Sequence, residues 1–161
     1  MLFIHDTRDK PGKHKNVDAY LKANGHQIVR SKMYVGDIAL MNDQTVCIDL
    51  KKDLQELHQN VCQQHVRFRN ELIRARDANI SLLFLCEHGP DITTLSDVRN
   101  WENPRLKVSP YALSGMELYK RLVSIENKYH VTFLFCEKRN TGAEIIRILS
   151  QNIPEYGIER R

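Results

Sequence analysis

The stretch from Tyr34 to Leu57, YVGDIALMNDQTVCIDLKKDLQEL, decides the fold and carries the candidate chemistry. Apolar runs at 38–40 and 45–50 flank a polar turn at 41–44, which is typical of a β-hairpin. Asp37 precedes the first arm and Asp49-Leu50-Lys51 ends the second, so the hairpin would bring two carboxylates and an ammonium group to one end. Two hard oxygen ligands suit Mg²⁺, and a neighbouring lysine can neutralise developing charge or position a water. The pattern therefore indicates metal-assisted hydrolysis of a phosphodiester.

Strand and helix patterns alternate around this hairpin. Apolar runs predict strands near 2–6, 26–32, 80–86 and 131–136, and the last two, nearly continuous, are expected to be central parallel strands. Helical spacing predicts helices at 15–24 and 53–78, the second of them broken near its middle. Capping boxes at Ser114/Glu117 and Thr141/Glu144 predict two more helices, and 90–110 is expected to be an irregular connection. The order βαβββαβαβα predicts an α/β fold, a mixed central sheet with helices on both faces.

Length and composition agree with a single domain over 1–161. The chain has 161 residues, is 42% hydrophobic and carries a formal charge of +4, a mild basic bias that fits a nucleic-acid partner. Three of the four cysteines lie in apolar runs, which favours reduced core thiols and a cytoplasmic location. No signal peptide or apolar stretch approaching ~18 residues is present, so no membrane association is expected.

The residues at the predicted strand ends resemble the XPF/Mus-type structure-specific endonuclease domain of the PD-(D/E)xK nuclease superfamily. The matching motifs are Asp6-Thr7-Arg8-Asp9, Gly36-Asp37, Asp49-Leu50-Lys51 and Glu56-Leu57, and the likeness extends to Arg67-Phe68-Arg69 and both late strands. The resemblance implies a restriction-endonuclease-like fold and a dimeric, Mg²⁺-dependent nuclease, with Mn²⁺ as a substitute and no small-molecule cofactor. Its substrate would be branched DNA, such as flaps or four-way junctions, in recombination or repair.

The resemblance also suggests roles for individual side chains. Metal binding is expected from Asp37 and Asp49, with Asp6 or Asp9 as an outer or second-site ligand, and Lys51 is expected to orient the attacking water. Arg8 is interpreted either as a phosphate ligand or as a structural partner of Asp37 or Asp49. Further DNA contacts are expected from Arg67, Arg69 and Lys52, and a wider basic surface includes Lys10, Lys13, Lys15, Arg74, Arg76, Lys138 and Arg139.

The chain departs from the family pattern at two motif positions. Asp49 stands where the family has Glu, a change that keeps a legal metal ligand, and Leu50 replaces the usual Arg. We expect no helix-hairpin-helix module, which by analogy suggests a stand-alone phage or mobile-element member, acting in the cytoplasm, at the nucleoid or in the host cytoplasm. The missing Arg keeps an alternative open, a non-catalytic pseudonuclease that binds branched DNA as a scaffold or partner subunit. A nuclease of the same superfamily for linear duplex or RNA is a second alternative.

Two further patterns have a structural interpretation. His58, Cys62 and His65 share a helical face, but a closed zinc site needs four ligands and no fourth is obvious nearby, so packing is favoured. An apolar strip on the last helix is interpreted as core with some dimer contribution, and it consists of Ile145, Ile146, Ile148 and Leu149.

Overall fold

A computed structural model describes residues 1–151 as one six-stranded mixed sheet between two layers of helices. The strands are β1 (Leu2–Asp6), β2 (Gln27–Ser31), β3 (Ile38–Leu40), β4 (Asp43–Lys51), β5 (Ser81–Glu87) and β6 (Thr132–Cys136). They lie in the order β2-β1-β3-β4-β5-β6. Only β3 runs antiparallel to its neighbours, and all the other strands point the same way. The predicted mixed sheet is confirmed.

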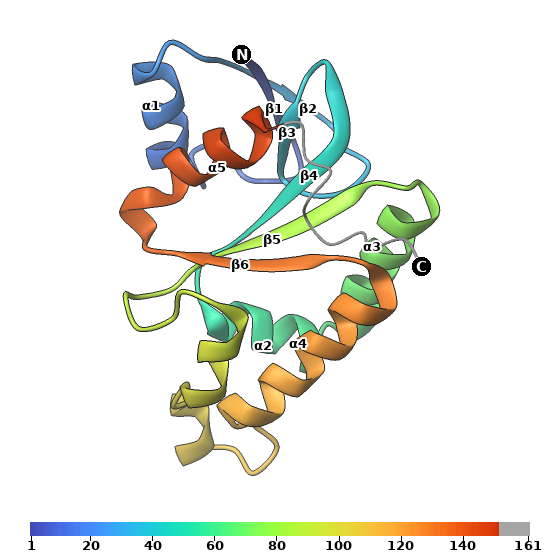
Figure 1. The fold of residues 1–161 in the computed structure, drawn as a ribbon, viewed down its shortest axis with the longest axis vertical. Helices are drawn as coiled ribbons and strands as arrows, with labels where there is room; N and C mark the ends of the chain where they lie inside the picture. Colours follow the sequence, from blue (N-terminus) through green and yellow to red (C-terminus); the bar gives the residue numbers. More distant parts are fainter. Residues whose placement is uncertain (152–161) are drawn as a thin grey trace.

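Helices cover both faces of the sheet (Figure 1). On one face lie α1 (Lys15–Ala23) and α5 (Thr141–Ser150), and on the other lie α2 (Leu54–Cys62), α3 (His65–Asp77) and α4 (Gly115–Tyr129). The apolar strip of α5 belongs to the core, since Ile145 and Ile148 are fully buried and Leu149 is nearly so. No helix within residues 1–151 has the length and apolarity needed to span a membrane.

The hairpin of β3 and β4 forms as the sequence predicts, with a tighter turn. Leu40 pairs with Asp43, so β4 begins two residues earlier than expected, and the register shifts between Ala39 and Leu40. Alternation along β4 then sends Cys47, Asp49 and Lys51 to the face covered by α2 and α3. The intervening Ile48 and Leu50 enter the core beneath α1 and α5. The hairpin thus delivers its charged residues to one face only.

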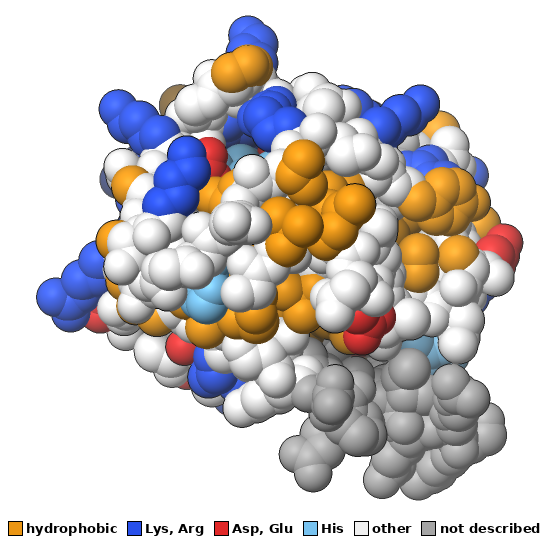
Figure 2. Space-filling view, turned by 90° about the horizontal axis from the view of Figure 1, so that it is seen from above, with side chains coloured by type: hydrophobic (Ala, Val, Ile, Leu, Met, Phe, Trp, Pro, Cys, Tyr) orange, Lys and Arg blue, Asp and Glu red, His pale blue; other side chains and the backbone are white. Residues whose placement is uncertain are grey.

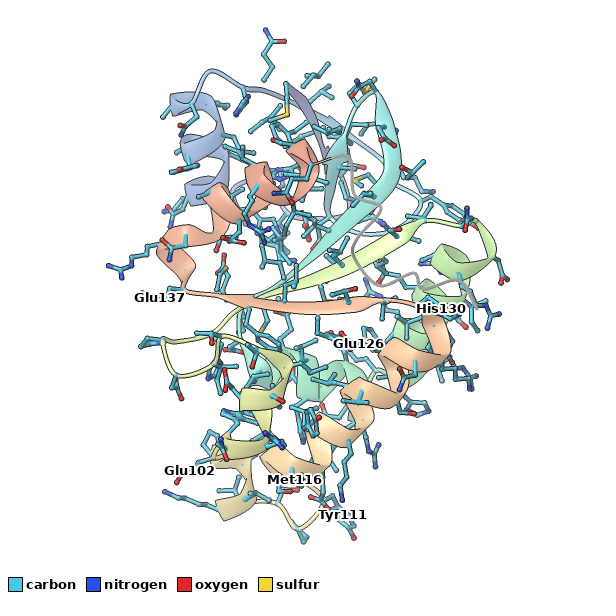
Figure 3. The ribbon with its side chains drawn as sticks, in the orientation of Figure 1. Glu102, Tyr111, Met116, Glu126, His130 and Glu137 are labelled. Atoms are coloured by element: carbon cyan, nitrogen blue, oxygen red, sulfur yellow. The ribbon has the colours of Figure 1, made fainter. Side chains whose placement is uncertain are left out.

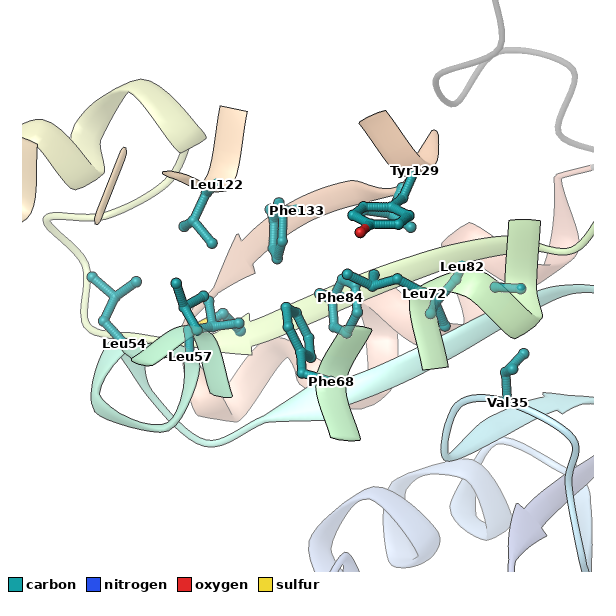
Figure 4. Close-up of a cluster of buried hydrophobic side chains, with 14 of the residues drawn as sticks. Val35, Leu54, Leu57, Phe68, Leu72, Leu82, Phe84, Leu122, Tyr129 and Phe133 are labelled. Atoms are coloured by element: carbon teal, nitrogen blue, oxygen red, sulfur yellow. The ribbon is translucent and has the colours of Figure 1, made fainter. Parts of the chain in front are cut away.

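The helical region after the hairpin is interrupted, as expected, between Cys62 and His65. Asp53 caps the first half, because the backbone N–H of Glu56 donates to its carboxylate at 2.9 Å. The break separates two apolar faces that both pack on the sheet. The second face includes Phe68, whose ring centroid lies 5.2 Å from that of Phe84. Phe84 in turn stacks on Phe133, with 5.0 Å between the ring centroids (Figure 4).

The prediction that both late strands are central is correct for β5 and wrong for β6, which is an edge strand. Phe133 and Phe135 of β6 pack in the core beneath α4, while Leu134 and Cys136 pack beneath α5. Helices therefore cover both faces of this edge strand. A strand covered on both faces has a continuous apolar sequence whether or not it has two neighbours, so the sequence could not distinguish the two positions.

Of the two predicted capping boxes, only the one at α4 forms. Ser114 and Glu117 exchange hydrogen bonds of 2.8 and 3.2 Å with each other's backbone N–H groups. Thr141 is instead the first residue of α5, and its hydroxyl donates to Glu87 at 2.8 Å. Glu144 binds Arg147. The hydroxyl of Thr141 therefore ties the helix to the end of β5 rather than capping it.

The segment between β5 and α4 is irregular, as predicted, with two short 3₁₀ turns at Leu95–Asn100 and Pro104–Lys107. Asn103 anchors it, since its side chain donates to Leu113 O at 2.8 Å and accepts from Gln55 at 2.9 Å. The segment extends away from the sheet, and Figure 3 shows Tyr111 at its far end, where the side chain is 90% exposed.

Candidate active site

Charged side chains gather where the parallel strands end. Asp6 is the last residue of β1 and Lys51 is the last residue of β4. Asp49 lies two residues before the end of β4. Asp37 immediately precedes the antiparallel β3, so it lies at the same edge. A polar cleft of about 230 Å³ opens there, lined on its other side by α2 and α3. Open α/β sheets usually bind ligands at the carboxyl ends of their strands.

The backbone of Asp37 is fixed from both sides. Its N–H donates to Ile48 O at 2.8 Å, and its carbonyl accepts from the N–H of Asp6 at 2.9 Å. Its carboxylate accepts from the N–H of Leu50 at 2.8 Å. The preceding Gly36 has φ +73°, and a Cβ there would lie 3.1 Å from Ile48 O. The positive φ and the close approach of β4 therefore favour glycine at position 36, and Asp37 supplies the carboxylate.

Asp49 and Lys51 form a buried ion pair on β4. Lys51 Nζ lies 2.6 Å from Asp49 Oδ1 and 5.6 Å from the centre of the Phe84 ring. Although burial opposes it, the pKa of Lys51 is raised, because the adjacent carboxylate of Asp49 favours the ammonium form. The lysine thus remains charged beside Asp49.

Negative charge is in excess at this end of the sheet. Burial raises the pKa of Asp49 to about 6, with Lys51 opposing the rise and Glu71 adding to it. Burial also raises the pKa of Asp37 well above its usual range, and repulsion from Asp49 adds to the effect. Buried carboxylates that repel one another are costly to ionise unless a cation neutralises them. The arrangement of these carboxylates therefore favours a neighbouring cation.

Asp6 is engaged differently from the other two aspartates. Its carboxylate accepts from the guanidinium of Arg8 and, at 3.3 Å, from the backbone N–H of Met33. Arg8 also donates to Met33 O at 3.2 Å. The partner of Arg8 is therefore Asp6, rather than Asp37 or Asp49, and its side chain, 43% exposed, lies on the lining of the cleft.

Asp9 belongs to a small cluster that includes a residue the sequence did not suggest. Lys13 Nζ lies 2.6 Å and His14 Nε2 3.0 Å from the Asp9 carboxylate. Although burial opposes it, these hydrogen bonds hold the pKa of Asp9 below its usual range. Within residues 1–151, the group of three side chains close enough to share one metal ion is Asp9, His14 and Asp37, with ligand atoms within 4.8 Å of one another. His14 lies in the loop before α1, where no sequence pattern distinguishes it.

Helix α3 contributes a polar stripe to the cleft. Arg67, Glu71 and Arg74 line the cleft from positions i, i+4 and i+7 of the helix. Glu71 accepts from the backbone N–H of Gly36 at 2.9 Å and so ties the helix to the loop that carries Asp37. Arg69, expected with Arg67 at the DNA, is exposed and lies outside this lining. Lys52, also expected at the DNA, is exposed just past the end of β4.

Of the three side chains that share the spacing of a zinc site, His58 and Cys62 make other contacts. The backbone N–H of Leu113 donates to His58 Nε2 at 3.0 Å, and Cys62 Sγ lies 3.8 Å from the same nitrogen. His65 is exposed at the start of α3. The favoured interpretation of these residues as structural therefore agrees with the contacts they make.

The chain is similar to known proteins in sequence and in fold. A family model described as the ERCC4 domain matches residues 6–149. No curated protein sequence matches the chain. Solved structures of XPF from Aeropyrum pernix are similar in fold, one with a TM-score of 0.65 at 15% identity over 93% of this chain. A second, in complex with DNA, has a TM-score of 0.64 at 14% identity over 92%. The match spans 63% of the length of each of these two XPF chains.

Proposed function

The chain belongs to the ERCC4 domain family, and on this premise we propose that it is a metal-dependent endonuclease that hydrolyses phosphodiester bonds of branched DNA, such as flaps or four-way junctions. The observation that carries the proposal is the arrangement of Asp37, Asp49 and Lys51 at the floor of a polar cleft. Asp49 lies 2.6 Å from Lys51, Asp37 lines the same cleft, and the pKa values of both carboxyl groups are raised. They suit a phosphate and a cation.

The donor set fits Mg²⁺, and Mn²⁺ is expected to substitute for it. Asp37 and Asp49 would hold the ion, because both offer hard oxygens whose mutual repulsion a divalent cation relieves. Asp9, which has a carboxylate oxygen within 4.8 Å of one of Asp37, would be a further ligand, and Asp6 would act as an outer residue that fixes Arg8. When bound, Mg²⁺ supplies Lewis-acid polarisation of the phosphate and a lowered pKa of the attacking water.

The remaining chemistry falls to the side chains of the cleft. Lys51 would orient the attacking water and balance charge at the phosphate, since its ammonium group is already held against Asp49 at 2.6 Å. Arg67 and Arg74 on α3, with Arg8 opposite, would contact neighbouring backbone phosphates. Such contacts carry no base information, so we expect discrimination by DNA shape and only weak sequence preference.

The test is cleavage of labelled flap and four-way-junction DNA with Mg²⁺ or EDTA, by the native protein and by Asp49→Asn. The matched control is Asp43→Asn, the same change at the exposed start of the same strand. We expect metal-dependent cleavage by the native protein and the control, and none by Asp49→Asn. Linear duplex and single-stranded RNA in the same panel separate the alternative nuclease substrates.

A different result identifies the second candidate. Tight, shape-selective binding without cleavage in either Mg²⁺ or Mn²⁺ would overturn the proposed activity and indicate a pseudonuclease. Equal cleavage of linear and branched DNA would overturn the substrate class alone. Junctions with permuted arm sequences should be cut at similar rates.

We also propose that the protein acts as a homodimer in the compartment that holds the DNA, the cytoplasm or nucleoid. The resemblance to dimeric nuclease domains supports this. Light scattering at micromolar concentration tests it, since a mass of about one chain, 18.8 kDa, would exclude the dimer under those conditions.

A further inference from the structure

A second hollow, of about 870 Å³, adjoins the cleft at the same edge of the sheet. It lies between the start of α1, the end of β4, helix α2 and the turn η3 (Lys138–Asn140) that leads into α5. We name it the basic groove, because six cationic side chains line it: Lys13, Lys15, Lys51, Lys52, Lys138 and Arg139. Figure 2, which views the molecule from above relative to Figure 1, shows Lys and Arg side chains around the outline of that face.

Half of the cations of the basic groove have no carboxylate partner. Its acidic side chains are Glu56, which accepts from the N–H of Lys52 at 2.8 Å, and Glu87, which accepts from the Thr141 hydroxyl at 2.8 Å. Three of the six cations have carboxylate partners elsewhere, namely Asp9, Asp49 and Glu137. Lys15, Lys52 and Lys138 form no ion pair with any residue in 1–151 and are exposed. The ligand that fits is an extended anion.

The floor of the groove is apolar and includes an aromatic ring. Val17, Tyr20 and Leu50 contribute to the lining, and Tyr20 is 38% exposed. The ring of Tyr20 packs against Gly142 at the start of α5, where an added Cβ would lie only 2.5 Å from Tyr20 Cδ1. The glycine therefore makes room for the ring and fixes its position. A basic groove with an aromatic side chain is the usual arrangement for single-stranded nucleic acid, whose phosphates follow the charges and whose bases stack.

The groove is continuous with the cleft. Lys13, Leu50, Lys51 and Glu56 line both hollows, so a strand that lies with one phosphate at Asp49 can continue into the groove without leaving the surface. Figure 3 shows Glu137, the residue between β6 and η3, on the side of the molecule opposite His130. From this continuity we propose that the basic groove binds an unpaired DNA strand next to the bond to be cut. This proposal deepens the proposed function, because it states which part of a branched substrate the protein holds.

The test measures binding without cleavage. The groove variant combines Lys15→Ala, Lys52→Ala and Lys138→Ala. The control combines Lys22→Ala, Lys107→Ala and Lys120→Ala, which removes the same charge from exposed sites outside both hollows. Fluorescence anisotropy in EDTA gives the affinity of each protein for a 12-nucleotide DNA strand and for a blunt duplex over a salt series, after circular dichroism has confirmed that both variants are folded.

We expect the groove variant to bind single-stranded DNA at least about tenfold more weakly than the control, with the slope of log affinity against log salt reduced by about 2. Duplex affinity should fall equally in both variants. Tyr20→Leu should weaken single-strand binding several-fold and leave the salt slope unchanged. Equal losses of single-strand affinity in the two triple variants would overturn the proposal, as would a loss of duplex affinity in the groove variant as large as its loss of single-strand affinity.

This binding assay and the cleavage assay together separate this proposal from the proposed function. If the native protein cuts no branched DNA, the endonuclease activity fails. A selective loss of single-strand binding in the groove variant would still establish the groove. If cleavage occurs and the groove variant binds single strands like the control, the active site remains and the groove assignment is refuted.

Discussion

Asp49→Asn is expected to stabilise the metal-free protein while it abolishes cleavage. The pKa of Asp49 is raised by burial from 3.8 to about 6 in the folded chain, so the folded state holds a proton that the unfolded state has released between these pH values. The free energy of unfolding therefore falls as pH rises through this range. Above pH 6, where the carboxyl group is ionised in both states, the loss of stability is complete. Asparagine resembles the protonated carboxyl group and carries no such dependence.

The size of the effect follows from the two pKa values. Their difference corresponds to about 3 kcal/mol, since a tenfold change in an equilibrium is worth about 1.4 kcal/mol. At pH 7.5 in EDTA, Asp49→Asn should exceed the native protein in free energy of unfolding by about 3 kcal/mol, and at pH 4.5 by only about 1 kcal/mol. The opposing effect of Lys51 is already contained in the raised pKa of Asp49.

Urea denaturation in EDTA at a series of pH values measures this difference. Asp43→Asn is the control, because hydrogen bonds from Thr45 lower the pKa of Asp43, so its removal should destabilise the protein near neutral pH. Added Mg²⁺ should stabilise the native protein and reduce the difference in free energy of unfolding between it and Asp49→Asn. If Asp49→Asn is less stable than the native protein in EDTA at pH 7.5, the charge of Asp49 is favourable where it lies and the reasoning is refuted.

Three further substitutions test other parts of the site and the core. Gly36→Ala should lower the free energy of unfolding by more than the ~1–2 kcal/mol of a left-handed alanine, because the added Cβ meets β4. Gly25→Ala is the control, because a Cβ at this position, with φ +77°, meets nothing within 4 Å. Denaturation and cleavage assays compare the two variants. Glu71→Gln keeps an acceptor for Gly36 and removes a negative charge that raises the pKa of Asp49, so the pH dependence of stability in EDTA should shift to lower pH. Phe84→Ala removes a ring packed between two others and should cost about 3–5 kcal/mol in urea unfolding, with Asp43→Asn again as a mild control.

Much of the fold could be predicted because its signals are local. The hairpin depends on a polar turn between two apolar arms, and the interrupted helix depends on two apolar faces, at Leu54/Leu57 and Phe68/Leu72. The errors concern relations between distant segments. Nothing near Thr141 indicates that its hydroxyl will meet Glu87, 54 residues earlier in the chain, and so the expected capping box was wrong.

The same distinction between local signals and distant contacts applies to the residues of the site. Asp6 and Asp49 follow from the ends of the parallel strands β1 and β4, and Asp37 follows from the start of the antiparallel β3, which lies at the same edge. Glu71 and Arg74 did leave a signal, since they continue the stripe of Arg67 at helical spacing beside the apolar face of α3. His14 left none, because its place beside Asp9 depends on how the loop of residues 7–14 folds over the sheet edge.

Leu50 is the departure whose meaning changes most once the structure is considered. In the sequence it stands between Asp49 and Lys51, where the resemblance predicts a cation. Along a strand, however, successive side chains point to opposite faces, and Leu50 enters the core beneath α1 and α5 with Ile48 and Leu85. Its backbone N–H still holds the carboxylate of Asp37 at 2.8 Å. The departure therefore keeps the contact that holds Asp37, and it places an apolar side chain where the cleft and the basic groove meet.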